Sequence, residues 1–306
     1  MTNNMFKFLR KKQFIPPAPG CVPSPKDIRD LLLSTIQPVV VRIPKECPPP
    51  FDLTILNQGA NPYCVGFSSA SLKQEKEMRE KNFLIFDGEW IYKKCKELDG
   101  VPNMAGTWLR IAMKVLQKIG AKPQDQLEDV AEKYKIGSYA LVDELTFEGL
   151  KKAIFTNGCL LAGFYGSNAG WQTAYIRPPK SGETTWGHAI LLIGYNENYI
   201  IGQNSWGMDW GDKGLFYVPK DYLPFEAWAV LTDLPLPEEG WVAMEFLRSL
   251  GLIEGAKVSP VTVLNFRDAP GLKGNILTKV RPSDQLEIIK IGEKIDGYNW
   301  AKVKIL

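Results

Sequence analysis

The stretch Asn57-Gln-Gly-Ala-Asn-Pro-Tyr-Cys-Val-Gly-Phe-Ser-Ser-Ala70 places Cys64 between a segment rich in turn formers and a helical pattern that continues to Arg79. Asn, Gly and Pro before the cysteine favour a tight turn. The first amides of a helix lack backbone partners, and the positive end of the helix dipole lies beside them. Both features stabilise a thiolate, the nucleophilic form of cysteine. We therefore expect Cys64 to present its thiol at a surface cleft, although a lone cysteine on a helix is more often a buried core residue.

The only histidine of the chain, His188, begins an apolar strand pattern, and a turn at Asn196 leads to a second strand that ends at Asn204. A hairpin centred on Asn196 places His188 and Asn204 directly opposite each other. Opposed residues have Cβ atoms roughly 4.5 to 5.5 Å apart, so the imidazole can donate a hydrogen bond to the amide oxygen. Taken alone, His188 fits a structural histidine and Asn204 a turn residue.

Together these residues supply the groups that nucleophilic catalysis by a thiol requires. An activated thiol needs a base, and the base needs a group that orients it. Cys64, His188 and Asn204 fit these three roles. Gln58 lies six residues before Cys64 on the preceding turn. Its amide N–H and the backbone N–H of Cys64 can point at one substrate oxygen, which predicts an oxyanion hole.

Three motifs resemble those of the papain-like cysteine peptidase family, in the family's order. Asn57 to Ala70 resembles its glutamine-to-cysteine motif, and Trp186-Gly-His-Ala-Ile190 resembles its histidine motif. Asn204-Ser-Trp-Gly207, followed by Trp210-Gly211 and Gly214, resembles its asparagine motif. The separations from the cysteine (188 − 64 = 124 and 204 − 64 = 140) are close to the roughly 130 to 150 residues typical of the family.

The resemblance covers about residues 45 to 233 and implies an α+β fold with two lobes, one helical and one of antiparallel strands. It implies a cysteine-type peptidase, a thiol protease that hydrolyses peptide bonds through a thiolate–imidazolium pair and an acyl-enzyme. The residues that the resemblance assigns to catalysis are Gln58, Cys64, His188 and Asn204. It also implies that Trp206 shields the His–Asn hydrogen bond from water.

Substrate binding is assigned by the same resemblance to Gly106, Trp108 and Gly187. The segment Gly106-Thr-Trp108 fits the start of a helix equally well. Two positions depart from the family pattern: Asn61 replaces a disulfide cysteine, and Val65 replaces the tryptophan that commonly follows the nucleophile. The long inhibitory propeptide of the family has no counterpart in the sequence, so we expect no activation by removal of a large pro-domain.

The cysteine count and the charge exclude several other classes of protein. Five cysteines without a C-x-x-C pair, together with a single histidine, argue against a disulfide framework and against a structural zinc site. We expect no metal and no cofactor. A formal net charge of +3 gives no argument for a nucleic-acid partner. No apolar segment follows the basic N-terminus, and none reaches the roughly 20 residues of a membrane span. We expect a cytoplasmic or virion-associated protein without a Sec signal peptide.

Apolar spacing predicts the secondary structure. The predicted helices are Cys64 to Arg79, Glu89 to Leu98, Thr107 to Ile119, a weaker one from Gln124 to Tyr134, and Thr146 to Asn157. The predicted strands are Cys159 to Phe164, His188 to Gly194, Tyr199 to Asn204, Gly214 to Val218 and Trp228 to Leu231. The expected parts of the chain are a proline-rich arm (1–45), a papain-like domain (46–234), a linker (235–257) and a C-terminal domain (258–306). Two short helices are also expected, one in the arm at Asp27 to Ser34 and one in the linker from Trp241 to Leu250.

The C-terminal segment resembles a bacterial SH3-like domain. Leu264-Asn-Phe-Arg-Asp-Ala-Pro-Gly271 and Gly297-Tyr-Asn-Trp-Ala-Lys-Val303 carry this resemblance, and the strand and turn pattern suits a small β-barrel. The resemblance implies a targeting module for a protein or cell-wall ligand, with a purely packing role as the alternative.

Three functions remain open at this point. The chain is expected to be an endopeptidase acting on proteins or peptides, with the SH3-like domain as its targeting module. The alternatives are a cell-wall peptide hydrolase and a non-catalytic peptide-binding module of papain-like fold.

Overall fold

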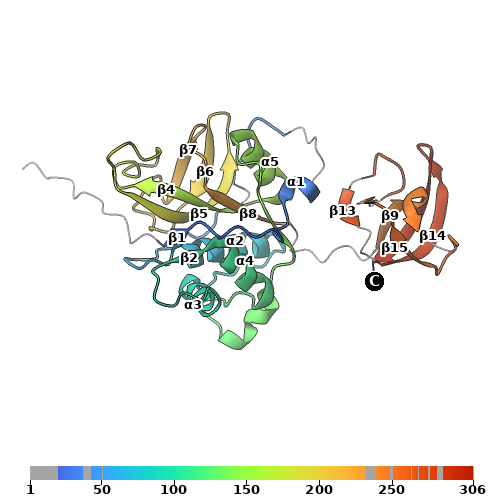
Figure 1. Cartoon of the computed structure of the whole chain (residues 1–306), viewed down its shortest axis with the longest axis horizontal. Helices are drawn as coiled ribbons and strands as arrows, with labels where there is room; N and C mark the ends of the chain where they lie inside the picture. The colour runs from blue at the N-terminus through green and yellow to red at the C-terminus, as the bar shows by residue number, and fades with distance from the viewer. Residues whose placement is uncertain are drawn as a thin grey trace, which may run out of the picture. The chain divides into compact units, whose positions relative to one another are not determined.

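The computed structural model divides the chain into two compact units, Met1–Asp233 and Leu234–Leu306 (Figure 1). Within the described residues, no helix is long and apolar enough to cross a membrane. The residues that the structure describes are 20–36, 43–49, 51–231, 239–248, 251–262, 264–267, 269–274, 276–280 and 285–305. The prolines at 16, 17, 19, 235 and 237 lie outside these ranges.

Three helices form one half of the first unit: α2 (Cys64–Arg79), α3 (Gly88–Leu98) and α4 (Leu109–Lys118). Local signals mark the start of α3 and the end of α4. The Asp87 carboxylate caps α3 by accepting the Trp90 amide at 3.0 Å. Gly120, with a φ of 99°, follows α4 and donates its amide to the Val115 carbonyl, as a left-handed glycine after a helix commonly does.

An antiparallel sheet forms the other half of the unit. Its strand order is β3-β8-β4-β5-β6-β7. The strands are β3 (Tyr139–Leu141), β4 (Leu160–Ser167), β5 (Thr185–Tyr195), β6 (Tyr199–Gln203), β7 (Leu215–Pro219) and β8 (Glu226–Val230). Helix α5 (Phe147–Asn157) begins at Thr146, whose side chain accepts the Gly149 amide, and packs on this sheet.

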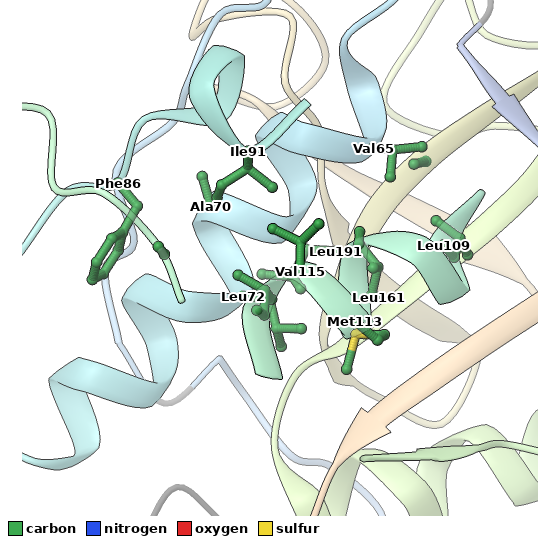
Figure 2. Packing of buried hydrophobic residues seen from close by; sticks show 14 of the residues in the cluster. Val65, Ala70, Leu72, Phe86, Ile91, Leu109, Met113, Val115, Leu161 and Leu191 are labelled. Atoms are coloured by element: carbon green, nitrogen blue, oxygen red, sulfur yellow. The ribbon is translucent and has the colours of Figure 1, made fainter. Parts of the chain in front are cut away.

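The two faces of the sheet belong to two hydrophobic cores, because successive residues of a strand point to opposite faces. Leu161 and its partner Leu191 join the core around α2 and α4, as Figure 2 shows. Leu160 and its partner Leu192 join the second core, which includes α5. Strands β4 and β5 are therefore shared between the helical half and the outer layer. This arrangement confirms the predicted α+β fold with a helical and an antiparallel β lobe.

The hairpin of β5 and β6 differs from the one predicted. Leu191 pairs with Gln203 and Tyr195 with Ile200, with a bulge between Leu192 and Gly194. The turn is thus centred after residue 197 rather than on Asn196, so His188 and Asn204 are not directly opposed. The Asn196 side chain causes this shift, because it accepts the amides of Asn198 and Tyr199 and draws both into the turn.

The N-terminal segment contributes one strand and one short helix to the first unit. Strand β1 (Cys21–Val22) pairs in parallel with β2 (Thr107–Trp108), which ends where α4 begins. The predicted helix start at Thr107 was therefore two residues too early. Helix α1 spans Leu33–Ile36 rather than the predicted 27 to 34, because Asp27 and Asp30 form a turn instead. Further along, Glu128–Tyr134 is a 3₁₀ helix.

In the second unit, the predicted helix from Trp241 to Leu250 was wrong over its described part. Residues Glu239–Ala243 form strand β9, Met244–Phe246 a 3₁₀ turn and Leu247–Arg248 strand β10. Strand β9 pairs with β15 along its length, and the buried residues Gly240, Val242 and Met244 alternate with residues that are only partly buried or exposed. Pairing with a distant strand thus overrides the local helical pattern.

The second unit is an antiparallel sheet whose described strands follow the order β10-β11-β14-β15-β9-β12-β13. The remaining strands are β11 (Lys257–Pro260), β12 (Leu264–Arg267), β13 (Ile276–Val280), β14 (Leu286–Ile295) and β15 (Tyr298–Ile305). Asp296 and Gly297 join β14 to β15 with φ angles of 53° and 85°, as a two-residue hairpin turn requires. Phe266, Ile288 and Val303 lie in its core.

We expect Leu191→Ala to lower the free energy of unfolding of the first unit by about 2 to 5 kcal/mol, because Leu191 is fully buried on a strand shared by both halves. Urea unfolding monitored by tryptophan fluorescence measures the change. The control is Leu127→Ala, at a side chain that is 77% exposed, where a change within about 0.5 kcal/mol is expected. Equal losses in the two variants would contradict this description of the core.

Candidate active site

Cys64 is the first residue of α2 and is completely buried. The backbone amides of Ala189, Val65 and Gly20 point at its sulfur, and they lower the pKa of the thiol. Burial has the larger effect and raises that pKa to about 11. The amide of Ala189 belongs to the residue after His188, so the start of α2 lies against the start of the buried part of β5. The predicted helix position is confirmed, whereas the predicted exposure of the thiol is not.

His188 and Asn204 are joined by a hydrogen bond of 2.8 Å between Nε2 and Oδ1. The bulge in β5 and the end of β6 at Gln203 bring the two side chains together although their Cα atoms are not paired. Asn204 is held in turn by its own amide, which donates to Gly214, and by the amide of Ser205, which donates to Oδ1. The hydrogen bond that the sequence predicted is therefore present, through a different register.

The bond to Asn204 fixes the tautomer of His188. Because Oδ1 of Asn204 only accepts, Nε2 carries the proton and Nδ1 carries the lone pair. Among the described residues, no hydrogen bond joins the His188 ring to the Cys64 thiol. Burial lowers the pKa of His188 to about 4, and the hydrogen bond to Asn204 only partly counteracts this. With a raised thiol pKa and a lowered imidazole pKa, both groups are neutral at pH 7.

Three tryptophan rings surround the imidazole. Trp206 lies against its face, with ring centres 4.7 Å apart and an angle of 31°. Trp171 and Trp186 approach edge-on at 5.6 and 6.1 Å. The sequence analysis assigned only Trp206 to this environment. It missed Trp171, which is fully buried and donates its Nε1–H to the Tyr222 hydroxyl, because the irregular segment before β5 gave no periodic signal.

Gln58 is held across the site by Ser205. The Ser205 hydroxyl donates to Oε1 of Gln58 at 2.7 Å, and the backbone amide of Gln58 donates to the Ser205 carbonyl at 2.9 Å. Nε2 of Gln58 donates one proton to the Asn61 carbonyl at 2.8 Å, which leaves its second N–H for another acceptor. Ser205 thus positions both Gln58 and Asn204. The sequence analysis quoted Ser205 within a motif but gave it no role.

The three residues predicted to bind substrate all contact residues 20–22. The Thr107 amide donates to the Gly20 carbonyl at 3.0 Å, and Val22 pairs with Trp108 in the β1–β2 ladder. Gly106, with a φ of 82°, lies so close that a Cβ there would be 2.4 Å from the Gly20 oxygen. On the opposite side, the Gly20 amide donates to the Gly187 carbonyl at 3.3 Å.

Gly20 also lies directly on the thiol. A Cβ at this position would be 2.2 Å from the Pro62 oxygen and 3.0 Å from Sγ of Cys64, so only glycine fits. In Figure 1 the segment that contains β1 runs between the helices and the sheet of the first unit. Residues 20–22, here called the covering segment, therefore bury Cys64 and occupy the predicted substrate-binding edge.

Residues 24–34 hold this segment in place. Ser24 donates its amide and hydroxyl to the Glu226 carboxylate, and Arg110 donates to the Pro25 carbonyl and to Asp30. Further on, Ser34 is bonded to Asp143. These contacts reach both the helical half and the sheet, so the covering segment is tied to each side of the site.

In the part of the chain that the structure describes, no group of three His, Cys, Asp or Glu side chains converges to hold a metal ion. All five cysteines are free thiols.

Comparison with known proteins identifies the family of this arrangement. Residues 110–223 match the profile described as papain family cysteine protease. Among solved structures, xylellain, a cysteine protease from Xylella fastidiosa, superposes with a TM-score of 0.62 at 25% identity, over 72% of this chain and 99% of xylellain. The first unit is a papain-like cysteine peptidase domain. The resemblance indicated by the three motifs is thereby confirmed.

Curated relatives of the peptidase domain are also named as peptidases. The chain is 25% identical over 217 residues to an uncharacterized peptidase C1-like protein of Acanthamoeba polyphaga mimivirus, covering 61% of this chain and 66% of that protein. It is 23% identical over 215 residues to procathepsin L of Mus musculus, covering 60% and 63%. The chain thus spans somewhat less than two thirds of these relatives. His188 and Asn204 lie inside the matched residues 110–223, whereas the placement of Gln58 and Cys64 rests on the geometry.

We expect the buried histidine to make the peptidase domain less stable in acid. Because the pKa of His188 is about 4 in the folded chain and about 6.5 when unfolded, the unfolded state binds the proton more readily between these pH values. The free energy of unfolding therefore falls as the pH decreases from about 6.5 to 4, by about 3 kcal/mol in total. Urea unfolding of wild type and His188→Gln between pH 7 and 4 measures the difference.

The variant lacks the only histidine, so its stability should fall less steeply over this window. The carboxylates titrate in both proteins, so their contributions to the free energy of unfolding cancel when the two curves are compared. Parallel stability curves for the two proteins would show that His188 is not held neutral by burial.

Proposed function

We propose that this chain is a cysteine endopeptidase that hydrolyses protein or peptide substrates. The observation that carries the proposal is the 2.8 Å hydrogen bond between His188 and Asn204 beside the helix start at Cys64. The bond leaves Nδ1 of the imidazole as the free base. Gln58, held by Ser205, keeps one N–H that does not bond to the Asn61 carbonyl and can serve the oxyanion.

The proposed reaction uses only these groups. Nδ1 of His188 takes the proton of Cys64, and the thiolate attacks the carbonyl carbon of the scissile peptide bond. The resulting oxyanion is stabilised by Nε2–H of Gln58 and the backbone N–H of Cys64. The imidazolium then protonates the leaving amine as the C–N bond breaks. Water, deprotonated by the same imidazole, hydrolyses the thioester and regenerates the thiol.

Reaction requires that the covering segment be displaced, because it buries the thiol and fills the edge formed by Gly106, Thr107 and Gly187. Burial is also the largest cause of both pKa shifts, upward for Cys64 and downward for His188. Displacement lets water and substrate reach the pair and favours its ionised form. In this proposal the segment keeps the enzyme latent until it moves.

A non-catalytic peptide-binding module is the alternative that the buried thiol keeps open. It is less well supported, since a binding groove has no need of an oriented imidazole enclosed by Trp171, Trp186 and Trp206.

For the second unit we propose an SH3-like module, from about residue 258 together with β9, that targets the enzyme to a protein or cell-wall ligand. Its curled antiparallel sheet and separate core support this proposal. If that ligand is cell-wall peptide, the enzyme is a cell-wall peptide hydrolase.

We also propose a cytoplasmic or virion-associated location, supported by the similarity to the mimivirus protein and by the free cysteines. A net charge of +3 offers no support for a nucleic-acid partner.

We expect three variants to separate the proposed catalytic roles. Cys64→Ala should abolish cleavage of a fluorogenic peptide library. Gln58→Ala should lower kcat/KM about 10² to 10³-fold, because it removes one oxyanion donor. Asn204→Ala should have a smaller effect, because Asn204 only orients the base. Steady-state kinetics on folded, full-length protein gives these values. Cys47→Ala, at a half-exposed cysteine outside the site, is the control. Full activity in Gln58→Ala would refute the oxyanion assignment, and activity in Cys64→Ala would refute the mechanism.

A further inference from the structure

Cys21 is a buried thiol that the proposed mechanism does not use. It is 3% exposed and belongs to the same hydrophobic core as Cys64, which is completely buried. Both residues are free thiols. Because Cys21 is the middle residue of the covering segment, a second sulfur lies in the part of the chain that must leave the nucleophile before a substrate can bind.

The cross-strand pair of Gly163 on β4 and Ala189 on β5 shows where the two sulfurs lie. A Cβ on Gly163 would be 3.3 Å from Sγ of Cys21. The amide of Ala189 points at Sγ of Cys64. Ala189 and both cysteines belong to one core, so the sulfurs lie on the same face of the sheet, each against one member of this pair. Cβ atoms of directly opposed residues are roughly 4.5 to 5.5 Å apart, and the separation of the thiols is of this order.

The covering segment leaves room for the two thiols to approach each other. Gly20 carries no side chain, and a Cβ there would be 3.0 Å from Sγ of Cys64. After burial, Cys64 is the largest cause that raises the pKa of Cys21, and a charge has such an effect only at short range. A disulfide requires Cβ atoms about 3.5 to 4.5 Å apart. The remaining shift falls on residues 20–22, which also move in the proposed mechanism.

We propose that Cys21 and Cys64 form a reversible disulfide that locks the covering segment over the nucleophile, with a small disulfide such as oxidised glutathione as the oxidant. The inference rests on the proposed function, because Cys64 must become a thiolate when the segment is displaced. This thiolate attacks the small disulfide, releases one small thiolate and leaves a mixed disulfide. The Cys21 thiolate then attacks the Cys64 sulfur, and the second small thiolate leaves. Two protein thiols are thus oxidised to one disulfide, and one small disulfide is reduced to two thiols.

Residues 24–34 favour the second of these steps. The bonds of Ser24 to Glu226 and of Arg110 to Asp30 keep the chain tethered beside the site while residues 20–22 are displaced. A tethered thiol meets its partner at a high effective concentration, so the mixed disulfide is short-lived. An oxidising environment therefore closes the enzyme, and a reductant releases both the nucleophile and the segment.

The test incubates the full-length chain with oxidised glutathione at neutral pH and maps its peptides by mass spectrometry without reduction. Digestion with chymotrypsin, which cuts after aromatic residues, separates Cys64 from Cys47. In wild type we expect the peptide of Cys21 linked to that of Cys64. In Cys21→Ser, Cys64 should instead keep one glutathione, because no second thiol displaces it. Cys95→Ser, which replaces another completely buried cysteine, on α3, should give the wild-type link.

Dithiothreitol should cleave the link and return the rate of Cys64 labelling by iodoacetamide to its value before oxidation. If Cys64 in wild type keeps glutathione as in Cys21→Ser, stays free although iodoacetamide labels it, or links to a different cysteine, the inference is overturned while the proposed function stands. If neither oxidised glutathione nor iodoacetamide modifies Cys64 at any pH, the proposed function fails, and this inference fails with it.

Discussion

The contact between the start of α2 and the start of the buried part of β5 is the constraint on which the rest of the site depends. The Ala189 amide points at the Cys64 sulfur, which fixes the nucleophile beside the residue that follows the base. This contact requires that β5 be shared by two cores, and Leu191 and Leu192 on opposite faces provide this. It also requires that the chain enter α2 through a tight turn, which places Gln58 within reach of Ser205. The geometry of every proposed catalytic group follows from this one junction.

Burial of that junction controls its chemistry. A neutral thiol and a neutral imidazole are stable inside the protein because separated charges lose their hydration there. The covering segment provides the burial on the open side, and the tryptophan rings provide it on the other. We propose that the covering segment is the part that moves, because Gly20 is held by backbone hydrogen bonds to Thr107 and Gly187, whereas Trp171 and Trp206 belong to a hydrophobic core. In the proposed mechanism, the same segment accounts for both latency and the route to the active form.

Local signals made part of this arrangement predictable from the sequence. Helix α2 begins at Cys64 and ends at Arg79 as predicted, since turn formers precede it and its pattern is continuous. The His188–Asn204 contact was predicted from a wrong register, because the apolar pattern does not show that the Asn196 side chain draws Asn198 and Tyr199 into the turn. The strand at Glu239–Ala243 could not be predicted, because it forms by pairing with the distant strand β15. The covering of Cys64 by Gly20 could not be predicted either, because it depends on contacts with Pro62, Thr107 and Gly187. A glycine in a proline-rich arm gives no sign of such contacts.

The pH dependence of Cys64 alkylation tests most directly the claim that residues 20–22 hold the catalytic pair neutral. In wild type, where burial raises the thiol pKa to about 11, iodoacetamide should react only slowly at pH 7 and faster toward alkaline pH. In Gly20→Val, whose side chain cannot fit between Pro62 and the thiol, the segment must lift. Cys64 should then react rapidly at neutral pH, as the thiolate of an ion pair does. Gly251→Val, where a Cβ meets nothing within 4 Å, should behave as wild type. Identical profiles for wild type and Gly20→Val, or a single rise near the pKa of about 8.5 of a simple thiol in both, would contradict the account.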